Sequence, residues 1–342
     1  KYLIIAFLCL FLFKFGRTDD PTVKFTGDLL KVLYSNSDKE ANTVFSPESL
    51  YTVIALLQQG GEGDTLQELT DVLNADAATT RRSYSDLAPK LKSAHNGTTL
   101  EIANKIYLET EFSIEPNFRN IAVDDFAADI DNIEFRNAPS AADTINKWVS
   151  DNTHGRITEL VSADSISPDT EAMLLNAVYF NGEWLHRFNS DETVDSPFTT
   201  LSGSQSTAPM MHLKDKLEAG ELTDVGAKYV RLPFKDQDFS MIVVVPNAVD
   251  GLGAVIDKLQ EDHLDSILHG MERTVDLTMP KFKFSTTSQL VPTLQKMGLN
   301  ALFTDGANLS GIARSPPLKV SDVLQKAEIE VDEKGATASA VT

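Results

Sequence analysis

Histidine and carboxylate side chains are the groups in this sequence that could support acid–base catalysis or bind a metal. The six histidines are scattered, and only His263 and His269 lie close together, at a spacing that does not place them on one helical face. The fifty acidic residues produce many carboxylate pairs, but no pair stands in a catalytic motif. Motifs for a serine-hydrolase nucleophile, a zinc protease, a phosphate-binding loop and a dinucleotide site are absent. The sequence therefore predicts no catalytic centre.

The composition excludes several classes of partner. Fifty acidic and thirty basic residues give a net charge of −20, which argues against binding to nucleic acid or to an anionic membrane, because both need a positive surface. Cys9 is the only cysteine, so neither an internal disulfide nor a thiolate metal cluster is possible. A length of 342 residues, 42% of them hydrophobic, suits either two domains or one large mixed domain.

The beginning of the chain has the proportions of a signal peptide. Lys1 precedes an apolar run over residues 3–13, and basic residues follow that run. The run is too short for a membrane span, which needs about twenty residues. We expect residues 1–17 to be a signal peptide and residues 18–342 to form a secreted protein; a buried N-terminal helix is the alternative. In a secreted protein, the sequon at Asn96 would be an N-glycosylation site.

Three segments show helical signals. Ser46-Pro47 predicts the start of a helix with the serine hydroxyl as its N-cap, and Gly60-Gly61 predicts its end. Between them, apolar residues recur at the spacing of one helical face. Two further helices are expected, one from near Asp64 to Leu73 and one over about residues 142–152.

Strand signals are strongest over residues 173–180 and 239–245. Both segments are nearly unbroken apolar runs, which predict strands covered on both faces at the centre of a large sheet. Residues 275–279 alternate instead, as in a half-exposed strand. Asn176 interrupts the first run, and a buried amide without a partner would cost about 1–3 kcal/mol, so we expect a partner nearby. The irregular order of helices and strands indicates an α+β fold.

These segments together resemble the serpins, the family of serine protease inhibitors. Residues 42–49 (Asn-Thr-Val-Phe-Ser-Pro-Glu-Ser) resemble the opening of the family's second helix, and residues 145–157 resemble the helix that lies across its main sheet. Residues 175–184 resemble the central strand of that sheet. Residues 331–335 (Val-Asp-Glu-Lys-Gly) resemble the hinge that leads into the reactive loop. The matches run in order from about residue 23 to the last residue, which makes the set specific.

The resemblance implies a single α+β domain, with three β-sheets, eight or nine helices and no cofactor. Inhibitory serpins expose a reactive loop as bait, and the target protease cleaves the loop and forms an acyl-enzyme. The N-terminal half of the loop then inserts as a new strand into the main sheet and distorts the protease. We therefore expect an extracellular, suicide-type inhibitor of serine endopeptidases, not an enzyme, that is monomeric when full length and binds neither nucleic acid nor membrane.

The residues of the hinge and loop suit such an insertion. Glu333 and Lys334 lead to Gly335, which has no Cβ to limit φ and would act as the pivot. Side chains alternate along a strand, and both sets are small and uncharged. The expected inward set is Ala336, Ala338, Ala340 and Thr342, and the outward set is Thr337, Ser339 and Val341. New ladder hydrogen bonds would contribute on the order of 10 kcal/mol. The alternative is a small-residue linker that alternates by chance.

The resemblance also assigns residues to two structural sites. The shutter, beneath the strands that open, is expected to contain Ser46, Ser49, Asn176 and Gln325. Gln325 replaces the family's usual histidine there, which keeps hydrogen bonding but removes sensitivity to pH. The breach, where the loop first enters the sheet, is expected to contain Trp184, Lys281 and Glu333, with an ion pair between the last two.

The sequence departs from the family pattern in two respects. Ala336 stands where threonine or serine is usual and Thr337 where glutamate is usual, and we expect inhibition to survive both changes. The scissile bond and the last strands of the second sheet should follow Thr342, so we expect the chain to lack them and to be a fragment or an incomplete product. The alternative functions are a non-inhibitory serpin, acting as a carrier, chaperone or storage protein, and an inactive truncated product.

Overall fold

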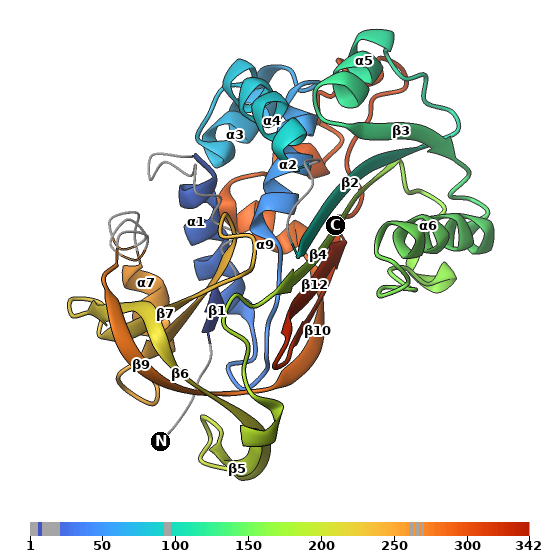
Figure 1. Ribbon diagram of the computed structural model, residues 1–342. Coiled ribbons are helices and arrows are strands. Elements are labelled where there is room, and N and C mark those ends of the chain that lie inside the picture. The colour runs from blue at the N-terminus through green and yellow to red at the C-terminus, as the bar shows by residue number, and fades with distance from the viewer. Residues whose placement is uncertain are drawn as a thin grey trace.

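A six-stranded main sheet dominates the computed structural model, which describes residues 6–8, 21–91, 97–259, 263, 267 and 270–341 (Figure 1). In spatial order its strands are β10 (Phe282–Gln289), β11 (Leu324–Val331), β12 (Gly335–Val341), β4 (Ala172–Glu183), β2 (Thr98–Glu109) and β3 (Ala128–Ile133). Neighbouring strands are antiparallel except β2 and β3, which are parallel. The apolar run at residues 173–180 lies in β4, inside the sheet as predicted.

The second sheet also has six strands. They are β1 (Ala6–Leu8), β8 (Ser240–Pro246), β7 (Ala227–Pro233), β6 (Gln205–Leu222), β5 (Val194–Thr199) and β9 (Glu272–Pro280). The long strand β6 pairs first with β5, then with β9 and finally with β7, so it joins two parts of this sheet. With these parts counted separately, the described residues form the three sheets that were predicted. Both predicted strands in this region are confirmed as β8 and β9.

The first strand falls within the predicted signal peptide. Ala6–Leu8 pairs with β8, with Ala6 opposite Val244. The other residues of the segment 1–17 lie outside the described part of the chain, and the signal peptide stays a prediction.

The part of the chain that the structure describes contains eight α-helices, within the predicted number. They are α1 (Pro21–Asn36), α2 (Pro47–Gln58), α3 (Gly63–Leu73), α4 (Ala77–Leu91), α5 (Pro116–Asp124), α6 (Ala138–Asn152), α7 (Leu252–Lys258) and α9 (Val291–Met297). None of them combines the length and the apolar character that crossing a membrane requires.

Two details of the helix predictions are wrong. Ser46 does occupy the N-cap position of α2, but its hydroxyl makes no capping hydrogen bond, and the backbone of Ser46 is engaged elsewhere, as described below. The predicted helix at residues 142–152 begins earlier, at Ala138, because Asn137 takes the N-cap position and a proline follows in the first turn.

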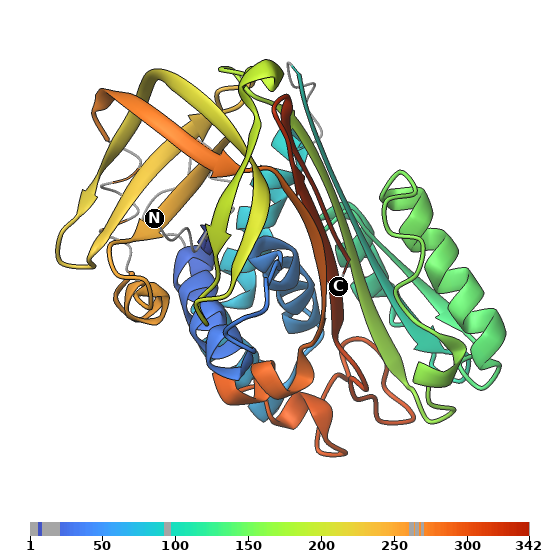
Figure 2. The same cartoon turned by 90° about the horizontal axis from the view of Figure 1, so that it is seen from below.

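The main sheet separates two layers of packing. Figure 2 shows α1 and α2 (blue) on one side of the sheet and α6 (green) on the other. The α2 side buries Ile106 and Leu174 of the sheet, and α6 covers Met173 and Leu175 of the opposite face. A third cluster lies between the main and second sheets and contains Phe180. The main sheet is therefore covered on both faces, and its edge strand β10 contributes the partly buried Phe282 and Phe284 to the third cluster.

Candidate functional site

The segment with the small side chains forms strand β12, inside the main sheet. It pairs antiparallel with β11 on one edge, where Ala336 lies opposite Val331, and with β4 on the other, where Ala338 lies opposite Phe180 (Figure 1). Both backbone edges of β12 are thus engaged, as in any interior strand.

The alternation of side chains along β12 follows the predicted order where it is described. Ala336 is buried, and Ala338 packs against the same cluster as Phe180 and Ile329. Thr337 lies on the other face, between Glu330 and Asn181. The side chains of Ser339, Ala340 and Val341, and all of Thr342, lie outside the described residues. The two inward alanines fit because a larger side chain would meet rings and branched chains of a closed cluster.

A tight turn over residues 332–335, which we name the hinge turn, connects β11 to β12. The Asp332 carboxylate accepts hydrogen bonds from the backbone N–H groups of Lys334 (2.8 Å) and Gly335 (3.1 Å). The Asp332 N–H donates to the Gly335 carbonyl at 3.0 Å. Asp332 therefore closes the turn from both sides, a role that the sequence analysis did not assign to it.

The structure shows a constraint on Gly335 that the sequence did not predict, while its role as a pivot stays a prediction. Gly335 is not among the residues with positive φ, so its place in the turn does not depend on the conformational freedom of glycine. A Cβ atom at Gly335 would instead lie 2.0 Å from the carbonyl oxygen of Gly182 on β4. The glycine permits close approach of two backbones, and Gly182 is a site residue that sequence reasoning missed.

Trp184 lies at the end of β4 beside the hinge turn, where the breach was predicted. Its indole Nε1 donates to the Asp332 carbonyl at 2.9 Å, and its backbone N–H donates to the Lys334 carbonyl at 2.9 Å. The indole is buried and stacks on Phe234, with ring centroids 4.6 Å apart. Trp184 thus ties the turn to the strand that flanks β12.

The predicted ion pair between Lys281 and Glu333 is present, with Nζ and Oε2 2.9 Å apart. Thr193 donates a second hydrogen bond to the same carboxylate at 2.9 Å. Burial raises the pKa of Glu333, but the hydrogen bonds from Lys281, from its own backbone and from Thr193 outweigh burial and leave the pKa below its ordinary value. The carboxylate is therefore charged at neutral pH and holds the hinge turn against the start of β10.

Gln325 joins β11 to the start of α2. It is 2% exposed, its Oε1 accepts from the Ser46 N–H at 2.9 Å, and its Nε2 donates to the Ser46 carbonyl at 3.1 Å. This pair of bonds uses the backbone of Ser46 and not its hydroxyl. Ser49 is also buried, close by on α2.

Asn176 can be placed only by its backbone. It pairs in register with Asn104 on β2, and its side chain lies outside the described residues, so the hydrogen-bonding partner expected for its amide stays a prediction. Asn104 is a buried amide that sequence reasoning missed; it donates to the Tyr84 hydroxyl at 3.0 Å and to the Phe126 carbonyl at 3.2 Å. Burial raises the pKa of Tyr84 to about 12.

The predicted glycosylation site, Asn96, also lies outside the described residues.

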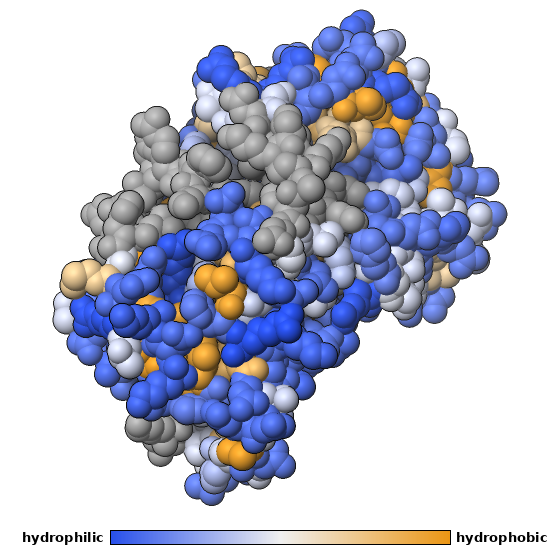
Figure 3. Space-filling view, in the orientation of Figure 1, coloured by the Kyte–Doolittle hydropathy of each residue, from blue (hydrophilic) through white to orange (hydrophobic). Residues whose placement is uncertain are grey.

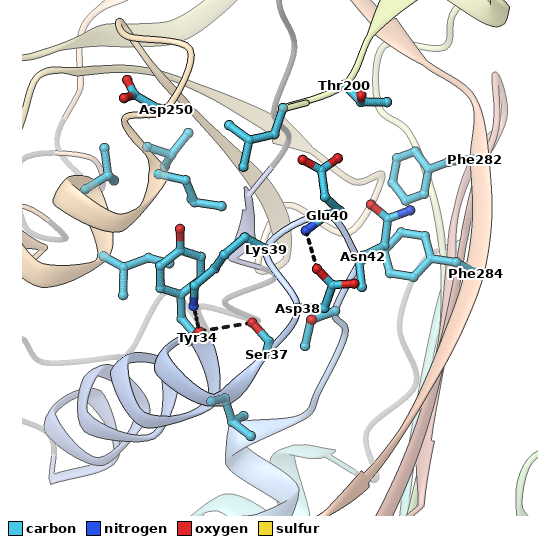
Figure 4. A pocket seen from close by; sticks show the side chains of 18 of the residues that line it. Tyr34, Ser37, Asp38, Lys39, Glu40, Asn42, Thr200, Asp250, Phe282 and Phe284 are labelled. Atoms are coloured by element: carbon cyan, nitrogen blue, oxygen red, sulfur yellow. Dashed lines mark hydrogen bonds between the residues drawn. The ribbon is translucent and has the colours of Figure 1, made fainter. Parts of the chain in front are cut away.

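Two further observations bear on metal binding and on cavities. No group of three or more metal-ligating side chains occurs among the described residues. An apolar groove of about 430 Å³ lies between the end of α1, Val244 and the start of β10 (Figure 4). Some polar groups that line the groove are hydrogen-bonded to one another. For example, the Glu40 N–H donates to the Asp38 carboxylate at 3.0 Å. Such a lining suits packing rather than acid–base chemistry.

The described part of the surface is largely polar on one face of the molecule (Figure 3). On the face shown in Figure 3, the described residues are mostly hydrophilic, and the hydrophobic ones gather in small separate groups.

Comparisons with known proteins agree with this arrangement. A family model described as "Serpin (serine protease inhibitor)" matches residues 21–342. The Drosophila melanogaster protein "Serine protease inhibitor 42Dd" is 33% identical over 91% of this chain and 83% of its own length. "Antichymotrypsin-2" of Bombyx mori is also 33% identical, over 91% of this chain and 83% of its own length.

Solved structures give the same result. The structure titled "Cleaved Serpin 42Da" is 32% identical to this chain and has a TM-score of 0.86, covering 94% of this chain and 87% of that one. Emu (Dromaius novaehollandiae) ovalbumin has a TM-score of 0.90 at 22% identity, covering 95% of this chain and 89% of that one, and so shows the likeness of fold alone.

Proposed function

This chain belongs to the serpin family, whose Drosophila melanogaster and Bombyx mori relatives reported above are named as inhibitors rather than as enzymes, and on that premise we propose that it is a secreted, suicide-type inhibitor of serine endopeptidases. The target protease attacks a peptide bond in the reactive loop that follows the hinge turn. The part of the loop that contains residues 336–341 then inserts into the main sheet as β12 and carries the attached protease with it.

The covalent step uses the protease's own chemistry. The serine Oγ of the protease attacks the scissile carbonyl, the amide C–N bond breaks, and the new amine leaves with a proton from the protease's general acid. The N-terminal part of the loop stays attached to the protease as an ester. This chain supplies no catalytic group; it supplies a strand that moves before water can hydrolyse that ester.

The single observation that best supports the proposal is the position of β12 between β11 and β4. The segment gains hydrogen bonds on both edges at about 1 kcal/mol each, which amounts to on the order of 10 kcal/mol. Its described inward residues, Ala336 and Ala338, meet apolar side chains of the cluster between the sheets. These terms favour insertion enough to make it effectively irreversible.

The experiment that tests the proposal mixes the full-length protein with trypsin-like, chymotrypsin-like and subtilisin-like proteases and looks for a complex that survives SDS. Two matched variants identify the cause: Ala338→Glu places a carboxylate on the inward face, and Thr337→Glu places one on the outward face. An unpaired buried carboxylate costs at least the roughly 1–3 kcal/mol of an unsatisfied polar group. We expect Ala338→Glu to reduce the yield of complex about tenfold or more, and Thr337→Glu to retain most of it.

Clean cleavage of the wild-type protein by all three proteases, with no stable complex, would instead indicate the non-inhibitory class of carriers and storage proteins. Equal loss in the two variants would show that strand alternation does not control trapping. Secretion is tested separately, by sequencing the N-terminus of the exported protein and by checking Asn96 for a glycan. The proposal expects a mature N-terminus near residue 18.

A further inference from the structure

The segment that follows α6 forms a rigid arm over the main sheet. Thr153, which is fully buried, donates from Oγ1 to the Val149 carbonyl at 2.9 Å and accepts from the Ile157 N–H at 3.1 Å. His154 and Gly155 then have φ values of 51° and 72°, which reverse the direction of the chain. Because the turn is fixed at both ends, the side chains that leave it have defined directions.

Two of those side chains contact the strands on either side of β12. The His154 ring lies edge-on to the ring of Tyr179 on β4, with centroids 4.5 Å apart. The Arg156 guanidinium pairs with Glu330 on β11 at 2.6 Å. In the strand register, Tyr179 lies opposite Ser339 and Glu330 lies opposite Thr337. Residues 154–156 therefore span the inserted strand and touch both of its neighbours.

The contact on β11 belongs to a network of charges. Lys283 on β10 lies 3.2 Å from Glu328 and 3.3 Å from Glu330, and Arg156 lies 4.0 Å from Glu328. The Arg156 guanidinium is the largest influence that keeps the pKa of Glu330 below its ordinary value. A second tie joins the same arm to β11, because Lys326 donates to the Glu159 carbonyl at 2.9 Å. Networks of this kind hold their geometry better than isolated surface pairs.

The spacing of the strands makes this arrangement specific to the six-stranded sheet. Neighbouring strands lie about 4.8 Å apart, so β4 and β11 are about two spacings apart with β12 between them and about one spacing apart without it. The side chains of His154 and Arg156 leave the turn in fixed directions and reach β4 and β11 when these strands are two spacings apart. If β12 left the sheet, the two contacts could not both keep their present geometry.

We propose that residues 154–156 form a clasp that closes over the inserted strand, with Arg156 as its positioning residue. The inference rests on the proposed function, because it concerns the step in which the loop enters the sheet. The clasp stabilises the inserted form relative to the form with an exposed loop. It thereby raises the fraction of encounters in which the protease is trapped before the ester is hydrolysed.

The test compares Arg156→Gln with a matched control, Arg136→Gln, in the full-length protein. Arg136 is also paired, with Glu111 at 3.6 Å, but it is well exposed and lies before α6. For each variant, the melting temperature is measured before and after the reactive loop is nicked by a non-target protease. The number of inhibitor molecules consumed per protease trapped is measured in parallel.

We expect Arg156→Gln to lower the melting temperature of the nicked form only, and to increase the inhibitor consumed per protease about two- to fivefold. Arg156→Lys, which keeps the charge, should restore part of the effect, and Arg136→Gln should change neither measurement. The clasp is overturned if Arg156→Gln shifts the melting temperatures of the intact and nicked forms equally, or shifts neither. The proposed function survives that result as long as the wild type forms stable complexes. A wild type that gains no heat resistance on nicking and forms no complex would overturn the proposed function itself, and the clasp with it.

Discussion

At the scale of single residues, Gly335 is the position where one added atom has the largest predicted consequence. A Cβ there would approach the Gly182 carbonyl oxygen to 2.0 Å and the Glu183 Cα to 3.1 Å. Both are backbone atoms of β4, so the contact cannot be relieved by turning a side chain. This close contact exists only when the start of β12 lies beside β4. A substitution at Gly335 should therefore affect insertion of the strand and not the folding of the intact protein.

We therefore predict that Gly335→Ala impairs trapping while the intact protein folds normally. The variant should be cleaved in its reactive loop and should form at least about tenfold less SDS-stable complex, since displacing backbone costs more than the 1.4 kcal/mol that corresponds to a factor of ten. Gly27→Ala is the control, because a Cβ at Gly27 in α1 would meet nothing within 4 Å. Undiminished complex formation by Gly335→Ala would contradict this explanation of the glycine.

His212 provides a second prediction at this scale. Its two ring nitrogens lie 2.8 Å from an Asp276 oxygen and 3.1 Å from a Glu192 oxygen. The hydrogen bonds to Asp276 and then to Glu192 raise the pKa of His212, and the bond from His212 lowers the pKa of Glu192. The ring therefore links β6 to β9 and to the short 3₁₀ helix Ser190–Glu192 when it is protonated.

The sign of the pH dependence follows from these directions. The contribution of His212 is complete below its ordinary pKa of 6.5 and is lost as pH rises through the raised value. The contribution of Glu192 is complete above its ordinary pKa of 4.5 and is lost as pH falls through the lowered value. We expect His212→Gln to lower the melting temperature most between pH 4.5 and 6.5, and least near pH 9. A difference from wild type that is constant over that range would show that the ring acts only through packing.

At the scale of secondary-structure elements, Gln325 fixes β11 to the first turn of α2. Its amide accepts from the Ser46 N–H and donates to the Ser46 carbonyl, which also accepts from the Leu50 N–H at 3.3 Å. The bond connects a strand that borders β12 with a helix that packs under the sheet. Sliding of β11 during insertion would therefore be coupled to α2.

We predict that Gln325→Leu destabilises the protein by about 1–3 kcal/mol, because it leaves the Ser46 N–H without a partner and removes one of the two hydrogen bonds to the Ser46 carbonyl. Urea unfolding of the intact protein measures this loss. Gln295→Leu serves as the control, because that glutamine is exposed on α9. Gln325→His should retain hydrogen bonding but make stability fall at acid pH, since a buried histidine resists protonation. A Gln325→Leu variant as stable as the control would contradict the role assigned to the amide.

Some elements could be predicted from the sequence because their signals are local. Pro47 and Gly60 mark the ends of α2, and the apolar run of β4 identifies an interior strand. The strand β6 was missed because its residues are largely polar and its partners come from β5, β7 and β9. The role of Gly335 could not be predicted from the turn, because it depends on Gly182 in a distant strand. The contacts of Arg156 were missed for the same reason.

At the scale of the whole molecule, the account depends on one rearrangement of the main sheet. Residues 335–341 form an interior strand, the hinge turn is held by Trp184 and the Lys281–Glu333 pair, and residues 154–156 cross above. Each feature belongs to the sheet with the strand inserted. The proposed function requires a second form, with this segment exposed, from which insertion releases free energy.

Amide hydrogen exchange of residues 335–341, measured in the full-length protein before and after a protease nicks the reactive loop, tests this claim most directly. The account predicts rapid exchange in the intact protein and strong protection in the nicked one, because both edges of β12 then carry ladder hydrogen bonds. Control amides in β8 should be protected equally in both forms. Rapid exchange of residues 335–341 in both forms would show that the segment does not insert, and would contradict the account.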